Sequence, residues 1–111
     1  MINTVVLMGR LTADPTLRVS EFSGKEVCAF SIATQRPGTD ADGNRVADFF
    51  DIVTWEKTAK FVSDYFHKGD CIVVSGVLRT RTYEGRDGVR RHVVEIWARE
   101  VDFGRPRRDA Q

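Results

Sequence analysis

The sequence predicts an all-β fold: a small barrel of five strands with one helix. Three observations predict it. The length of 111 residues is sufficient for one hydrophobic core but not for two. Five segments are apolar or alternate apolar and polar residues, and Gly, Pro and Asp separate them. One segment alone has a helical period. We expect a single domain over residues 1–103 and a short, mobile basic tail over residues 104–111, where core residues are lacking.

The first half of the chain predicts three strands. Residues 2–11 are rich in Val, Ile and Leu and precede the turn pair Asp14-Pro15, so we expect a buried strand. Residues 26–36 alternate apolar and small side chains and predict a second strand. Residues 37–44 contain Pro, Gly and an Asp-Gly pair, which predicts a loop before a third strand over residues 45–55.

The second half of the chain predicts a helix and two strands. Ala59, Val62 and Phe66 share one helical stripe within residues 56–67, and Gly69 provides a stop signal. Residues 71–83 and 91–103 predict strands joined by a Gly-containing tip. Three strands, one helix and two strands is the order of the five-stranded OB barrel, with the helix between strands three and four and an extended hairpin of strands four and five.

Composition excludes several classes. Hydrophobic residues make up 41% of the chain and charged residues 30%, as in soluble globular proteins. No apolar run is long enough to span a bilayer, and the first residues lack the features of a signal peptide, so we expect a cytoplasmic protein. Cys28 and Cys71 have no neighbours at metal-ligand spacing, which predicts buried thiols and no metal or cofactor.

Charge is distributed unevenly along the chain. The net charge is +1, but residues 79–111 hold nine basic against six acidic residues, and all nine are arginines. Arginine pairs with phosphate through a planar fork and also stacks on bases. The basic end of the chain is therefore suited to nucleic acid.

Side-chain alternation in the third strand separates two faces. Phe50 and Ile52 form the natural core pair, so Phe49 and Trp55 project from the opposite face together with Asp51. Two large aromatic rings are costly to expose unless a partner covers them.

The same rule places Arg79, Arg81 and Tyr83 on one face of the fourth strand. Flat rings with interleaved cations are what single-stranded nucleic acid requires, because bases stack on the rings and phosphates pair with the cations. The alternative is that these rings pack under a loop or in a subunit interface. Taken together, the aromatic and arginine side chains favour DNA.

Three further residues have less specific signals. Trp97 lies between Ile96 and Ala98 and could belong to the core, to an interface or to a stacking surface, with core or interface favoured. Lys57 and Lys68 could reach phosphates, although lysines on a helix surface are usually only solvated.

Several stretches resemble a known family. They are NTVVLMGRL at residues 3–11 followed by Asp14-Pro15, ADF at 47–49 leading to VTW at 53–55, and KGD at 68–70 followed by GVLRTR at 76–81. In order and spacing they resemble the bacterial single-stranded DNA-binding proteins over residues 1 to about 103.

The resemblance implies an OB fold, a homotetramer built as a dimer of dimers, and binding of single-stranded DNA largely without sequence specificity in DNA replication, recombination and repair in the bacterial cytoplasm, at the nucleoid. It implies that Phe49, Trp55 and Tyr83 stack on bases and that Arg79 and Arg81 contact the backbone. Arg10 and Arg18 match further basic positions of the family.

Two departures from the family pattern affect the site and the partners. An aromatic residue that some members carry at the end of the second strand is replaced around Pro37-Gly38, and Asp51 adds a negative charge to the presumed DNA face. The usual acidic C-terminal tip is absent, so recruitment of other replication and repair proteins is doubtful; either the chain is shortened or it is a tailless paralogue.

Two other classes remain to be weighed against DNA binding. The first is an enzyme. The candidate acids and bases belong to no metal, nucleophile or phosphate-loop motif, so we expect no catalytic activity; they are Asp48, Asp51, Asp64, His67 and His92. An OB module used for oligomerisation or protein docking would instead place the exposed aromatic residues in a protein interface.

Overall fold

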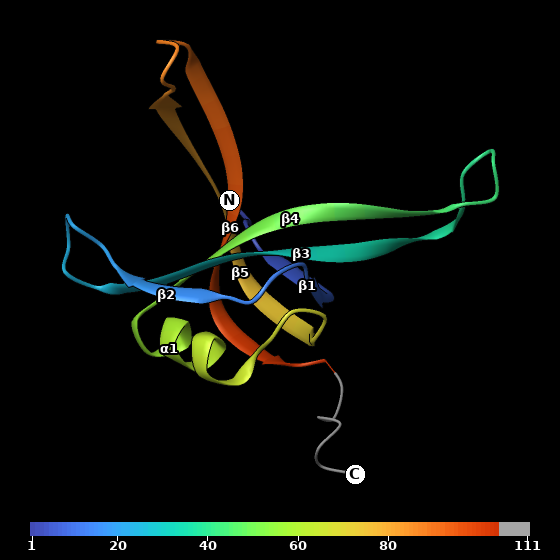
Figure 1. The fold of residues 1–111 in the computed structure, drawn as a ribbon, viewed down its shortest axis with the longest axis horizontal. Helices are drawn as coiled ribbons and strands as arrows, with labels where there is room; N and C mark the ends of the chain where they lie inside the picture. The colour runs from blue at the N-terminus through green and yellow to red at the C-terminus, as the bar shows by residue number, and fades with distance from the viewer. Residues whose placement is uncertain (105–111) are drawn as a thin grey trace.

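The computed structural model describes residues 1–104, and these form six strands and one helix (Figure 1). In chain order the elements are β1 (Val5–Leu11), β2 (Thr16–Val19), β3 (Glu26–Thr39), β4 (Arg45–Trp55), α1 (Glu56–Tyr65), β5 (Cys71–Glu84) and β6 (Arg90–Phe103). The expected tail over residues 104–111 falls almost wholly outside the described residues.

Five of the strands close into a ring. The order β1-β5-β6-β4-β3 is completed by pairing of β1 with β3, where Arg10 lies opposite Ala33 and Leu11 opposite Ile32. The pair β4–β6 is parallel and the other pairs are antiparallel. With α1 between β4 and β5, this is the predicted five-stranded OB barrel. The prediction of the fold class is confirmed.

Strand β2 was not predicted from the sequence. It has four residues, follows the Asp14-Pro15 turn and pairs along β3, with Arg18 opposite Val27. Its formation depends on antiparallel pairing with β3, the next strand in the chain, rather than on its own pattern, because a strand this short contains little periodic signal. β2 extends the sheet outside the ring.

The core lies inside the ring and follows the predicted alternation. Ile32, Ile52, Ile72, Val74 and Ile96 are almost completely buried, one or two from each of four strands. Phe50 is partly buried and packs against this cluster. Apolar side chains at every second position therefore fill the barrel, and the intervening positions are left to face outward.

Helix α1 closes one end of the barrel. Its apolar stripe of Ala59 and Val62, continued by Phe66 just after the helix, is fully buried against the ring. The helix ends at Tyr65, two residues earlier than predicted. Gly69 has a φ of 88° and its N–H donates to the carbonyl of Leu11 at 2.8 Å, which ties the connection after the helix to β1.

Two hairpins extend beyond the body of the barrel. Figure 1 shows the β3–β4 and β5–β6 hairpins as arms that point in different directions, with α1 beneath the ring. The β5–β6 arm ends in a tight turn, where the N–H of Gly85 donates to the carbonyl of Val89 at 2.9 Å. The arms carry strand residues that are exposed on both faces.

The two cysteines are free thiols. Cys28 is buried, and burial raises the pKa of its thiol, whereas Cys71 is only partly buried. Within residues 1–104, no three His, Cys, Asp or Glu side chains gather in a way that could hold a metal ion. No helix of the described chain is long and apolar enough to cross a membrane.

Candidate nucleic-acid interface

One continuous outer face runs across β3, β4, β6 and β5. Val53 lies opposite Ala29 in β3 and opposite Trp97 in β6, and Trp97 in turn lies opposite Val77 in β5. Side chains of paired residues point to the same side of a sheet, so these positions share the outer face. Trp55 and Trp97 are partly buried on this face, whereas Phe49 further along β4 lies opposite the small side chain of Ala33 and is exposed.

A hollow of about 630 Å³ lies in this face. It is bounded by β2, by the turn between β2 and β3, and by the outer sides of β3, β4, β5 and β6. The aromatic or charged side chains that line it are Arg18, Glu21, Phe22, Trp55, Arg81, Glu95 and Trp97. Aromatic rings, two guanidinium groups and two carboxylates therefore meet in one concave site.

Two tryptophans form the floor of the hollow. The ring centroids of Trp55 and Trp97 are 5.5 Å apart at an interplanar angle of 61°, which is an edge-to-face contact. Arg79 lies over the Trp97 ring, with its Cζ 5.0 Å from the centroid. The Trp55 Nε1 atom is buried and has no acceptor within residues 1–104, so packing rather than hydrogen bonding holds this ring.

A buried carboxylate lies next to the tryptophans. Glu95 is only 6% exposed, and its Oε1 accepts hydrogen bonds from Trp97 Nε1 at 3.0 Å and from Arg81 Nε at 3.2 Å. Arg81 also lies over the ring of Tyr83, with its Cζ 5.7 Å from the centroid. The predicted cations of β5 therefore contact aromatic rings on the same face.

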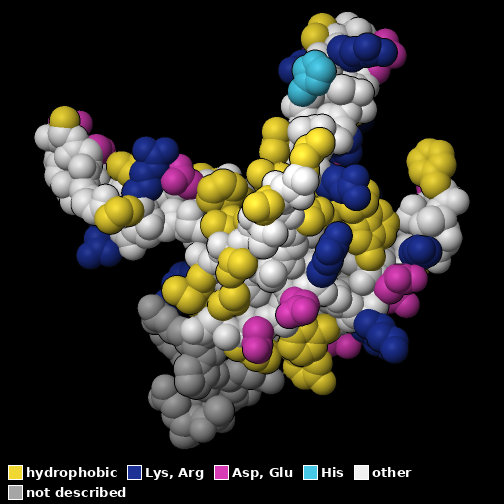
Figure 2. Space-filling view, turned by 180° about the vertical axis from the view of Figure 1, so that it is seen from behind, with side chains coloured by type: hydrophobic (Ala, Val, Ile, Leu, Met, Phe, Trp, Pro, Cys, Tyr) yellow, Lys and Arg dark blue, Asp and Glu magenta, His cyan; other side chains and the backbone are white. Residues whose placement is uncertain are grey.

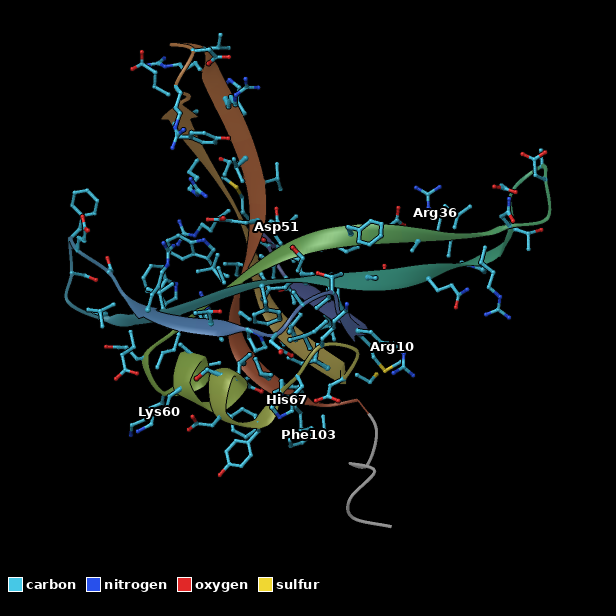
Figure 3. The ribbon with its side chains drawn as sticks, in the orientation of Figure 1. Arg10, Arg36, Asp51, Lys60, His67 and Phe103 are labelled. Carbon is cyan, nitrogen blue, oxygen red and sulfur yellow. The ribbon has the colours of Figure 1, made fainter. Side chains whose placement is uncertain are left out.

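Phe49 and Asp51 extend the face along β4. Phe49 is 69% exposed and lies opposite Ala33, where no larger side chain of β3 covers it. Asp51 accepts a hydrogen bond from Ser31 Oγ at 2.7 Å, and Figure 3 shows it near the point where β4 passes β6. The expected negative charge on this face is present, and a neighbouring hydroxyl solvates it.

The structure does not bring every predicted residue into the hollow. Phe49, Arg79 and Tyr83 share its face through strand register and ring contacts, while Arg18, Trp55 and Arg81 line it directly. Three predicted cations lie elsewhere in the fold: Arg10, Lys57 and Lys68.

Each of these three cations has a different environment. Arg10 donates from Nη1 to the carbonyl of Gly69 at 2.8 Å, near the end of β1 (Figure 3). Lys57 is exposed on α1, and Lys68 follows the helix, with its backbone N–H bound to Asp14 Oδ1 at 2.7 Å. They could contact only a strand that continues beyond the hollow.

Sequence reasoning did not assign four aromatic or charged residues of the hollow to the binding face: Glu21, Phe22 and Glu95 were missed, and Trp97 was left open. Trp97 lies outside the core cluster, which removes the core from the alternatives considered for it. The alternation of Ile96 and Ala98, both buried, was a signal that Trp97 points outward with Glu95. No sequence signal indicated Phe22, because only the pairing of β2 with β3 brings its turn to the hollow.

Figure 2 shows the molecule from the side opposite to that of Figure 1. On this surface hydrophobic and basic side chains lie side by side where the β5–β6 hairpin leaves the body. A closed five-stranded barrel with an outer face of rings and arginines defines an OB-fold protein whose exposed face has the chemistry of single-strand binding.

Comparison with known proteins agrees with this class. The model of the single-strand binding protein family matches residues 2–104, and the chain belongs to that family. A single-stranded DNA-binding protein of Bacillus cereus is 45% identical over 107 residues, which are 96% of this chain and 62% of that protein. Another, from Oceanobacillus iheyensis, is 44% identical over 93% of this chain and 63% of its own length.

A third relative is the single-stranded DNA-binding protein 1 of Staphylococcus aureus, which is 42% identical over 96% of this chain and 68% of its own length. The chain thus spans a little under two thirds of the Bacillus and Oceanobacillus relatives that it matches. The similarity covers the whole barrel, including every residue of the outer face.

Proposed function

We propose that this protein binds single-stranded DNA, largely without sequence specificity, and performs no catalysis. The observation that carries the proposal is the outer face on which Trp55, Trp97 and Phe49 are presented beside arginines. Every base has a π-face, so stacking on such rings tolerates any sequence, at about 1–3 kcal/mol per base. Family membership and the names of the relatives support the same ligand.

In this mechanism a strand lies along the outer face of β4 and β5. Bases stack on Phe49, Trp55 and Tyr83, and phosphates pair with Arg79 and Arg81. Duplex DNA conceals its base faces and should bind far more weakly.

Further basic residues would contact the strand outside this stretch. Arg18 lies at the edge of the hollow, and Arg10, Lys57 and Lys68 are exposed cations that a longer strand could reach. Each phosphate that a cation neutralises adds about −0.7 to the salt slope for a single strand. The proposed chemistry requires no metal and no cofactor.

The cellular role that fits this chemistry is protection of exposed strands during DNA replication, recombination and repair. The protein would act in the bacterial cytoplasm, at the nucleoid. The relatives that are named single-stranded DNA-binding proteins are bacterial, from Bacillus and Staphylococcus.

We also propose self-association into a homotetramer built as a dimer of dimers. Exposed apolar side chains support this: Val6 and Met8 on β1, Leu78 on β5 and Val94 on β6. Apolar side chains that stay exposed in a folded chain commonly mark protein interfaces. Residues 1–103 would form the unit that assembles and binds DNA, and residues 104–111 a short basic tail.

The alternative of a docking module is tested by Trp55→Ala. Under the DNA proposal, affinity for a fluorescein-labelled oligonucleotide falls by about 1–3 kcal/mol, measured by anisotropy, while light scattering shows an unchanged assembly. If the assembly breaks and the wild-type chain has little affinity for the oligonucleotide, the face is a protein interface and the proposal is wrong.

A further inference from the structure

Glu95 has an unusual position for a carboxylate on a face proposed to receive phosphates. It lies on β6 opposite Arg79 of β5 and is 6% exposed. A buried carboxylate is costly to remove from water unless it is paired and hydrogen-bonded. Its presence beneath the arginines therefore needs a structural reason.

That reason lies in its two hydrogen bonds. Glu95 Oε1 accepts from the indole Nε1 of Trp97 at 3.0 Å and from Nε of Arg81 at 3.2 Å. Bonds to an ionised acceptor are stronger and more directional than those between neutral groups. One oxygen atom thereby constrains the orientation of a ring and of a guanidinium group.

The constraint extends beyond these two neighbours. The edge-to-face contact between Trp97 and Trp55 depends on the orientation of the Trp97 ring. The guanidinium group of Arg79 lies over that same ring. Among the described residues 1–104 no acceptor contacts Trp55 Nε1, so the orientation of this ring depends on packing. Movement of Trp97 would therefore disturb the whole floor of the hollow.

We infer that Glu95 is a positioning residue, whose buried carboxylate holds the Trp97 indole and the Arg81 side chain in the orientation in which the outer face receives a single strand. The inference rests on the proposed function for its ligand. It also implies that Trp97 belongs to the binding face.

Simple electrostatics predicts the opposite effect of removing this residue. A negative charge near phosphates repels them, so loss of the Glu95 charge alone would tighten binding. Loss of a positioning residue weakens binding. Glu95→Gln and Glu95→Ala remove the same charge, but only glutamine keeps an oxygen that can accept from Trp97 and Arg81.

The first test compares the affinities of these two variants for labelled oligo(dT) at one salt concentration. We expect Glu95→Gln to bind as tightly as the wild type or more tightly, and Glu95→Ala to bind about fivefold or more weakly than Glu95→Gln. Glu100→Ala, which removes an exposed carboxylate from the same strand, is the matched control and should not weaken binding. Equal affinities of the glutamine and alanine variants would overturn the inference.

The second test needs no DNA. Trp55 and Trp97 are the two tryptophans of the chain, and rings held 5.5 Å apart in a fixed orientation give a tryptophan signal in near-ultraviolet circular dichroism. Glu95→Gln should keep this signal and Glu95→Ala should lose most of it, while urea unfolding shows both variants folded. If Glu95→Ala fails to fold, Glu95→Met fills similar space without a strong acceptor and takes its place.

The two tests separate the inference from the function on which it rests. If the wild-type chain does not bind oligo(dT) but the dichroism changes as expected, the proposed function fails while the positioning role stands. If binding is tight but the signal is the same in the acceptor-free variants as in the wild type, Glu95 does not position Trp97 and the inference fails.

Discussion

Replacing Phe49 by alanine separates stacking from folding more cleanly than any other change on the face. The ring is 69% exposed and lies opposite the small side chain of Ala33, so its removal should change the free energy of unfolding by no more than about 0.5 kcal/mol. Loss of one stacked base costs about 1–3 kcal/mol, which corresponds to a roughly 5- to 150-fold weaker Kd.

Anisotropy titration of a labelled oligonucleotide at several salt concentrations measures this effect. Phe49→Ala removes no charge, so the salt slope should equal that of the wild type while Kd rises at every concentration. Tyr65→Ala is the matched control, because Tyr65 is 47% exposed on α1 and its ring contacts Phe61 rather than the face. An unchanged Kd, or an equal loss in the control, would refute the reasoning.

Three further predictions concern charge, packing and pH. Arg79→Ala should make the salt slope shallower by about 0.7, measured by the same titration, and an unchanged slope would show that Arg79 contacts no phosphate. Gly76→Ala should destabilise the fold by roughly 1–3 kcal/mol in urea unfolding, because an added Cβ would overlap the carbonyl oxygen of Trp97; wild-type stability would contradict this. The exposed Arg36 side chain hydrogen-bonds to Asp48 and lowers the pKa of that carboxyl, so the stability that Asp48 adds is present above its unfolded pKa and is lost as pH falls through the lower folded pKa. Unfolding of the wild type and of Asp48→Asn as a function of pH should therefore converge in acid, and a constant difference would contradict the pairing.

Much of the fold was predictable because its elements carry local patterns. The alternation at Phe50 and Ile52 and the helical stripe ending at Phe66 each identify an element and its buried side. Strand β2 escaped prediction, since its four residues gain their structure from pairing with β3. Helix α1 ends earlier than predicted because Phe66 packs into the core in an extended conformation.

The binding face was predictable in part for a related reason. Alternation within one strand correctly separated Phe49 and Trp55 from the core and placed Arg79 with Arg81. The alternation pattern could not show that β4 and β6 pair in parallel. This pairing places Trp97 beside Trp55. Contacts of this kind depend on barrel closure between distant strands.

The most direct test of the account is titration of intrinsic tryptophan fluorescence with oligo(dT) and with a matched duplex at two salt concentrations. Both tryptophans line the proposed site, so bases that stack on them should quench their emission deeply. The account predicts strong quenching by oligo(dT) that weakens with salt, and little quenching by the duplex. Absence of quenching by oligo(dT), or equal quenching by the duplex, would contradict it.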